Sequence, residues 1–204
     1  MDLLENPFYV LGASPRDDRK RIMELADEGA LQLDPQECSE ARSTLTIPRK
    51  RIKAELTWMP GIAPNRSSAV IAMVHNAPSR LLELENVTPL ARCNLIAAGL
   101  SRSKVTNSND VSNWILCLCR SFENVRASEI LDLINEERIA AGFSKEVDIS
   151  VVDAELSERK VHYRQVMKNA LDQLAPRDLV GGVTDAVEKA TNVGDVQGPK
   201  LLND

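Results

Sequence analysis

The sequence predicts an all-α protein with a small N-terminal helical unit followed by a multi-helix bundle. Aromatic residues make up only 3% of the 204 residues, so Ala, Leu, Val and Ile supply most of the apolar side chains. A shortage of aromatics disfavours a sheet. Apolar residues recur at steps of three and four, which is the spacing of a helix that buries one face. Gly and Pro stand mostly between these segments and separate one helix from the next.

Three helices are expected within the N-terminal unit, residues 1–61. Asp17 and Asp18 precede the first, at about 19–33, where a carboxylate can accept hydrogen bonds from the first amides of the helix. A short helix should follow at 37–45. Pro48 then begins a third helix, because proline fits the first turn. Breaker residues after it predict a linker at 62–67.

The helix that begins at Pro48 combines an apolar face with a basic one. The inward positions should be Ile52, Leu56 and Met59. The outward positions should be Arg49, Lys50, Arg51 and Lys53. These cations could contact phosphates. No aromatic or Gly-rich phosphate feature accompanies them, so a solvated helix face is the favoured interpretation.

The bundle is expected over residues 68–193, followed by a flexible tail at 194–204. Its helical segments should be 67–77, 79–86, 89–100, 111–122, 129–141, 150–174 and, more weakly, 178–192. Asp110 and Ser128 stand where N-terminal caps are expected. Gly142 is well placed for a left-handed turn that ends a helix.

Several classes of protein are disfavoured by composition. The net charge of −5 argues against wholesale binding of nucleic acid or an anionic membrane. No run of about 18 apolar residues is present, so we expect a soluble, cytoplasmic protein. The cysteines lack Cys-x-x-Cys or Cys/His metal spacing, and His75 and His162 are isolated from one another. We therefore expect no metal and no cofactor.

The opening stretch resembles the J domain of DnaJ-type co-chaperones. The aromatic pair and Leu-Gly-x-Ser-Pro of that family are matched by residues 8–15, FYVLGASP. The family's helix start falls on Asp18 and its first core isoleucine on Ile22. Further on, Ala41, Leu45, Pro48, Lys50 and Arg51 match the end of its third helix and the start of its fourth. The resemblance covers residues 6–56. The arrangement of the whole chain is similar to that of bacterial proteins in which such a beginning precedes a helical region.

The departures from the family bear on function. J domains stimulate the ATPase of DnaK-type chaperones through a His-Pro-Asp loop, which aligns here with Asp34, Pro35 and Gln36. Only the proline is kept. The family's basic residues on the second helix align with Asp27 and Glu28, whose opposite charge should oppose docking by about 1 kcal/mol each or more. The resemblance therefore implies the fold without ATPase stimulation.

Other polar and aromatic residues have structural alternatives to a functional role. Asp18 and Asp34 could be acid–base or metal groups, but helix capping is the favoured role. Trp58 ends a helix beside a breaker, and a buried plug between the two regions is favoured over an exposed anchor. Cys117 and Cys119 are two apart on a helix and should point away from each other.

The favoured hypothesis is a non-enzymatic protein–protein interaction adaptor. The J-like module would dock a larger protein or a chaperone, and the helical region would recruit a second partner. The docking surface is expected to include Asp27, Glu28, Asp34, Pro35, Gln36, Arg49, Lys50 and Arg51. Two alternatives stay open: a genuine co-chaperone with an altered loop, and a nucleic-acid-associated subunit that uses the basic helix at 49–53. An enzyme is not expected, because no constellation combines a nucleophile, a base and a stabilising group.

Overall fold

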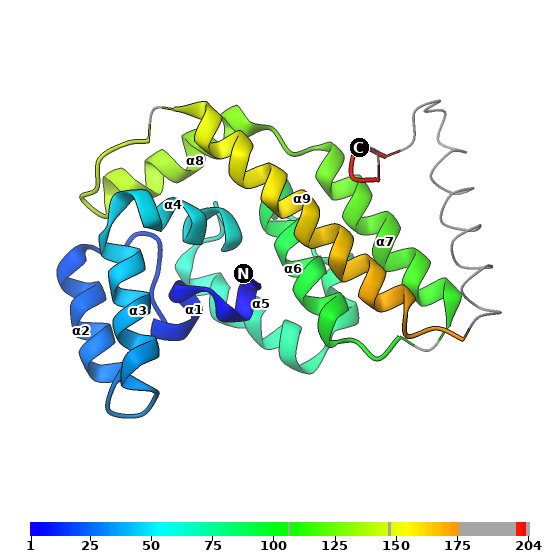
Figure 1. Ribbon diagram of the computed structural model, residues 1–204, viewed down its shortest axis with the longest axis horizontal. Helices are drawn as coiled ribbons and strands as arrows, with labels where there is room; N and C mark the ends of the chain where they lie inside the picture. Colours follow the sequence, from blue (N-terminus) through cyan, green and yellow to red (C-terminus); the bar gives the residue numbers. More distant parts are fainter. Residues whose placement is uncertain (106, 147, 176–198, 203–204) are drawn as a thin grey trace. The chain divides into compact units, whose positions relative to one another are not determined.

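The computed structural model describes residues 1–105, 107–146, 148–175 and 199–202 (Figure 1). Throughout these ranges every regular element is a helix, which confirms the all-α prediction. The helix expected at 178–192 and most of the tail expected at 194–204 lie outside the described residues. Within the described part of the chain, no helix is long and apolar enough to cross a membrane.

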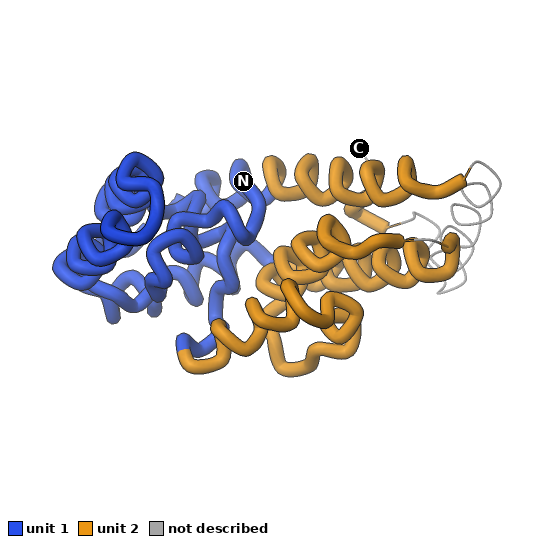
Figure 2. Tube along the Cα trace, turned by 90° about the horizontal axis from the view of Figure 1, so that it is seen from below, with its two compact units in different colours: residues 1–64, 126–156 blue, residues 65–125, 157–204 orange. Residues whose placement is uncertain are grey.

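The chain divides into two compact units, coloured separately in Figure 2. Unit 1 contains residues 1–64 and 126–156, and unit 2 contains 65–125 and the described residues from 157 onward. The first boundary falls inside the predicted linker at 62–67, although residues 64–67 are already helical. Residues 126–156, which we expected in the bundle, group with the N-terminal helices instead. Their polar contacts, described below, give the physical reason.

Unit 1 is a set of short helices around α3. It contains the 3-10 helix η1 (Leu3–Glu5), α1 (Pro7–Leu11), α2 (Arg19–Gly29), α3 (Pro35–Thr46), α4 (Pro48–Thr57), α8 (Ala127–Ala140) and the beginning of α9 (Ile149–Leu171). Helix α3 packs against α1, α2 and α4. As predicted, Ile22, Ala41 and Leu45 are buried between them. The buried amide of Asn6 donates to the carbonyl of Ala54 and the hydroxyl of Thr57, both at 2.8 Å, and so fixes the start of α1 on α4.

Two predicted helix caps are confirmed in unit 1. The Asp18 carboxylate accepts a hydrogen bond from the backbone N–H of Arg21 at 2.8 Å, and Asp34 accepts one from Gln36 at 2.8 Å. The predicted end of the first long helix at 33 is wrong, since α2 ends at Gly29. Leu31 and Leu33 are 86% and 50% exposed. Without buried apolar contacts, the predicted last turn of the helix, residues 30–33, is not stabilised.

Unit 2 is built around α6 (Pro89–Arg102), which is buried along most of its length. Its other elements are α5 (Pro64–Asn76), the 3-10 helix η2 (Pro78–Glu83), α7 (Ser108–Glu123) and the later part of α9. Helix α6 packs against α7 and η2. At Gly99, an added Cβ would lie 2.6 Å from Leu81 and 2.8 Å from Trp114, so only glycine permits this close packing.

The predicted caps in the bundle are partly wrong. Asn107, not Asp110, caps α7, because its side-chain oxygen accepts from the Asp110 N–H at 2.9 Å. Helix α8 has no side-chain cap, and Ser128 lies inside the helix, whose preceding residue is Arg126. Gly142 has a φ of +71°, in agreement with the predicted left-handed turn.

A buried polar contact joins α9 to α6 within unit 2. The Asn94 side-chain oxygen accepts from the Tyr163 hydroxyl at 2.6 Å and from the Arg159 guanidinium at 2.8 Å. Burial raises the pKa of the Tyr163 hydroxyl, so it stays a donor. This contact fixes the register of the two helices.

Candidate functional site

Arg51 is not on the surface, so its predicted outward orientation is wrong. Its side chain is fully buried and donates to Glu55 at 2.8 Å, to the Leu45 carbonyl at 3.0 Å and to the Pro15 carbonyl at 2.6 Å. Its guanidinium also lies 4.2 Å from the ring centroid of Phe143. Arg51 therefore packs inside unit 1 and is not available to a partner.

A buried cluster of charges joins α4 to α8. We call Arg51, Glu55, Glu137 and Arg138 the α4–α8 charge cluster. The two oxygens of Glu55 accept separately from Arg51 and from Arg138, each at 2.8 Å. Burial raises the pKa of Glu55, and the charges of the two guanidinium groups oppose that shift. Arg138 also donates to the Pro48 carbonyl at 3.0 Å.

Glu137 is the least compensated member of the α4–α8 charge cluster. It is 5% exposed, and one carboxylate oxygen accepts from the Gly61 N–H at 3.1 Å. Its other oxygen has no hydrogen-bond partner in the described part of the chain. Burial raises the pKa of Glu137 to about 7, although the hydrogen bond from Gly61 acts to lower it. The whole cluster attaches α8 to the N-terminal helices, which is a structural role.

The other predicted site residues on α2 and α3 are exposed together. We call residues 27–36, with the exposed Leu31 and Leu33, the α2–α3 tip. Asp27 lies 3.5 Å from Arg42, and Glu28 lies 3.6 Å from Arg21. Asp34, Pro35 and Gln36 are exposed at the start of α3.

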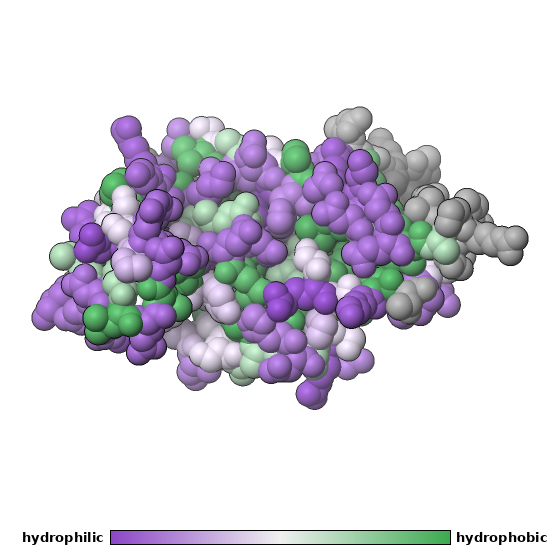
Figure 3. All heavy atoms as spheres, turned by 60° about the horizontal axis from the view of Figure 1, so that its bottom comes forward, coloured by the Kyte–Doolittle hydropathy of each residue, from purple (hydrophilic) through white to green (hydrophobic). Residues whose placement is uncertain are grey.

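Acids predominate at the α2–α3 tip, and the cations that pair with two of them, Arg21 and Arg42, flank it on α2 and α3. Between residues 24 and 40 the sequence carries acids at Glu24, Asp27, Glu28, Asp34, Glu37 and Glu40, and no Lys, Arg or His. Leu31, near the centre of this acidic stretch, is 86% exposed. Figure 3 shows that the visible surface is mostly hydrophilic, with hydrophobic patches between. An exposed leucine pair inside an acidic surface is a combination suited to binding a protein rather than to catalysis.

The basic residues of α4 form a smaller surface than predicted. Arg49, Lys50 and Lys53 are exposed, whereas Arg51 is buried. Loss of the central cation weakens the case for a phosphate-binding helix. Trp58 is buried within unit 1, so it is not the exposed anchor that the sequence left as the alternative, and its ring centroid lies 6.0 Å from that of Phe8.

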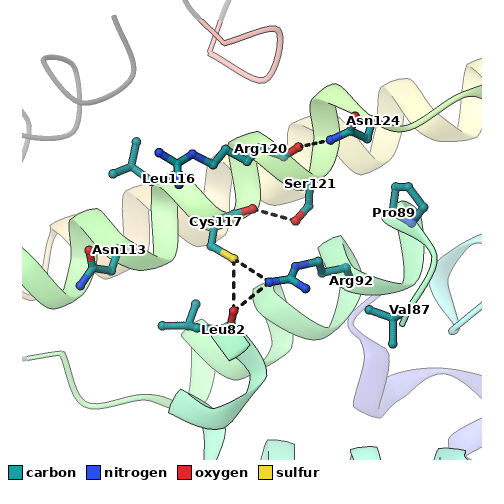
Figure 4. Close-up of a pocket in the computed structure, with 10 residues that line it drawn as sticks. All are labelled: Leu82, Val87, Pro89, Arg92, Asn113, Leu116, Cys117, Arg120, Ser121 and Asn124. Carbon is teal, nitrogen blue, oxygen red and sulfur yellow. Dashed lines mark hydrogen bonds between the residues drawn. The ribbon is translucent and has the colours of Figure 1, made fainter. Parts of the chain in front are cut away.

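A groove in unit 2 was not predicted from the sequence. It has a volume of about 690 Å³ and runs along α7 beside η2 and the start of α6 (Figure 4). We call it the α7 groove, and its lining residues are Leu82, Val87, Pro89, Arg92, Asn113, Leu116, Cys117, Arg120, Ser121 and Asn124. The α7 members recur at three and four residue steps, on the side of the helix opposite the predicted apolar face. This second stripe of residues on α7 is the sequence pattern that could have indicated the groove.

The cysteines and histidines do not gather into a site. Cys38, Cys93 and Cys119 are buried free thiols, while Cys117 is half-buried. Burial raises the pKa of Cys119 to about 12, so this thiol stays protonated. Over the residues that the structure describes, no three His, Cys, Asp or Glu side chains are placed to hold a metal ion.

Comparison with known proteins adds no relative. No protein-family model matches the chain, and neither the curated proteins nor the solved structures include a significant match.

Proposed function

We propose that this protein is a non-catalytic protein–protein interaction adaptor built on a degenerate J domain. The observation that carries the proposal is the α2–α3 tip, where exposed Leu31 and Leu33 stand within an acidic surface. Its partner should present an apolar pocket edged by Lys or Arg, because that surface would complement both features.

Two features support the degenerate J-domain part of the proposal. Four helices, α1 to α4, follow the order expected from the resemblance, and the turn between α2 and α3 falls where the family carries its His-Pro-Asp loop. In this chain the residues aligned with that loop stabilise the start of α3 instead. Asp34 caps α3 and Pro35 occupies its first turn.

An acidic tip also argues against docking on a DnaK-type chaperone in the usual way. The family resemblance implies that such chaperones present an acidic surface to the J domain. Like charges facing each other disfavour association. The co-chaperone alternative therefore requires a different mode of contact, and it is an outcome of the test below.

The test compares three forms of the tagged full-length protein in affinity capture from its native cells. The double variant Leu31→Ser/Leu33→Ser removes the apolar part of the tip. Val161→Ser changes a 63% exposed apolar residue on α9 and is the matched control. We expect one protein to be retained by the wild type and by Val161→Ser but not by the double variant.

A second measurement separates an adaptor from a co-chaperone. The ATPase rate of a DnaK-type chaperone is measured with and without the full-length protein, and no stimulation is expected. Stimulation that is lost in the double variant would contradict the proposal and favour the co-chaperone. Equal recovery of partners by all three forms would place docking elsewhere and overturn the role of the tip.

A further inference from the structure

The α7 groove has the dimensions of a binding site for a short extended chain. Its lining on α7 runs from Asn113 to Asn124, three helical turns or about 16 Å. An extended peptide covers that distance with about five residues. Leu82, Val87 and Pro89 lie on the side opposite α7 and make that side apolar.

One wall of the groove is fixed by Arg92. Its guanidinium donates to the carbonyl of Leu82 at 2.8 Å and to that of Leu84, and it lies 3.5 Å from the Cys117 sulfur (Figure 4). These bonds hold the segment between η2 and α6 beside α7. Arg92 is therefore a positioning residue, and its donors are used within the protein.

The remaining polar groups of the groove are available to a ligand. Arg120 is exposed, extends along α7 toward Leu116 in Figure 4, and forms no ion pair with any residue in the described ranges. Asn113 is exposed and makes no side-chain hydrogen bond within those ranges. Asn124 donates to the Arg120 carbonyl at 2.9 Å, which leaves its side-chain oxygen to accept another bond.

Charge selects the class of ligand. The ten lining residues include two arginines and no acid. Glu83 and Glu85 lie on the same chain segment as the wall but do not line the groove. Asparagine amides can pair with both the N–H and the carbonyl of a peptide backbone. Arg120 can pair with a carboxylate, and the apolar wall can hold a neighbouring side chain.

We propose that the α7 groove binds an extended segment of a partner protein in which an Asp or Glu stands next to an apolar residue. The inference rests on the proposed function in one respect, since this segment would belong to the second partner of the adaptor. Its structural basis lies wholly in unit 2 and is independent of the α2–α3 tip.

The first experiment selects ligands without assuming a sequence. A displayed library of random peptides about 12 residues long, enough to cover the groove, is panned on the full-length protein. We expect enriched peptides that combine Asp or Glu with Leu, Ile or Phe. Absence of enrichment, or enrichment of Lys-rich and Arg-rich peptides, would overturn the proposal.

Point variants then locate the bound peptide. Arg120→Glu reverses an exposed charge in the groove and should weaken an enriched peptide at least about tenfold, the loss expected for one charged hydrogen-bonded pair. Lys168→Glu makes the same change in charge at an exposed position of α9 and should leave affinity unchanged. Equal affinity of wild type and Arg120→Glu would overturn the assignment.

Cys117 provides a second readout of occupancy. It is the half-buried cysteine and lines the groove, whereas the other three are buried. A saturating peptide should slow modification of Cys117 by a thiol reagent, and Cys117→Ser should remove the fast-reacting thiol. An unchanged rate would contradict binding in the groove. Equal protection by free glutamate would identify a small-anion site and overturn the peptide assignment.

The controls separate this inference from the proposed function. The Leu31→Ser/Leu33→Ser variant should bind the selected peptides as well as the wild type does. Loss of partner capture by that variant with intact peptide binding supports both proposals. Loss of capture by that variant, with no peptide bound in the groove of the wild type, would overturn the groove alone. Intact capture by that variant, with peptide binding in the groove, would overturn the tip alone.

Discussion

Unit 1 contains two groups of charges with opposite environments. In the α4–α8 charge cluster, Glu55 is 1% exposed and accepts from two arginines at 2.8 Å. At the α2–α3 tip, Asp27 is 74% exposed, and its nearest cation is 3.5 Å away. Buried charges require partners, since transfer from water costs several kcal/mol per ion, whereas exposed charges are solvated and contribute little to stability. The same residue types therefore hold the fold together in one place and remain available to a partner in the other.

The largest expected difference between the two groups comes from removing one buried arginine. Arg138→Met leaves Glu55 buried with a single partner and should lower the free energy of unfolding by about 3–5 kcal/mol. Arg42→Met makes the same substitution in the exposed pair with Asp27 and should cost less than about 1 kcal/mol. Urea unfolding monitored by circular dichroism measures both. Similar losses in the two variants would mean that burial does not distinguish these charges.

The second largest effect should depend on pH. The pKa of Glu137 is raised to about 7 in the folded protein, so the folded state binds this proton more tightly than the unfolded state does. Its contribution to stability is complete below the unfolded pKa of about 4.3 and is lost as the pH rises through about 7. As the pH rises from 4.5 to 8, the free energy of unfolding of Glu137→Gln should increase by up to about 3 kcal/mol relative to that of the wild type.

That pH effect is measured as the stability difference between Glu137→Gln and wild type in a series of buffers. Other titrating groups largely cancel in the difference, because both proteins contain them. Glu28→Gln makes the same substitution at an exposed carboxylate of α2 and is measured alongside as the control. A difference between Glu137→Gln and wild type that stays constant from pH 4.5 to 8 would show that Glu137 titrates normally.

A smaller effect is expected at the helix cap within the α2–α3 tip. Asp34→Ala removes the cap of α3 and should cost about 1 kcal/mol in thermal or urea unfolding. Ser39→Ala, at an exposed position inside the same helix, should change stability by less than about 0.5 kcal/mol. If Asp34→Ala were equally neutral, the carboxylate would be free of its capping role and open to another function.

The smallest effect on stability should come from the tip itself. Leu31→Ser/Leu33→Ser should change the free energy of unfolding by no more than about 0.5 kcal/mol, because both side chains are exposed. Leu45→Ala, in the core of the same unit, should cost about 2–5 kcal/mol. A large loss in the double variant would mean that the tip leucines stabilise unit 1, and their proposed partner would be unnecessary.

Local sequence signals predicted much of the fold but little of the site. Carboxylates before helices identified the caps at Asp18 and Asp34, and Gly142 marked a helix end. These features depend on residues a few positions apart. Arg51 is buried with Glu55, four residues further along the same helix, which accepts a hydrogen bond from it. Helix spacing indicates such a pair but not its burial, and basic side chains are rarely buried.

Two other features depend on contacts between residues distant in the sequence. Glu55 and Arg138 are 83 positions apart, so no local pattern indicates that they pair. The α7 groove needs η2 and the start of α6 beside α7, and the residues on α7 alone form only a mixed stripe of polar and apolar side chains. Of the residues expected in the docking surface, those at the α2–α3 tip are exposed, whereas Arg51 is buried. Docking itself stays a prediction.

The division of unit 1 into two chain segments has a consequence for synthesis on the ribosome. At about 5–20 residues per second, Arg138 is added roughly 4–17 s after Glu55. During that interval, all of α5, η2, α6 and α7 is translated. Glu55 must stay hydrated until its second arginine arrives, because one partner does not offset its burial. Completion of unit 1 therefore waits for α8.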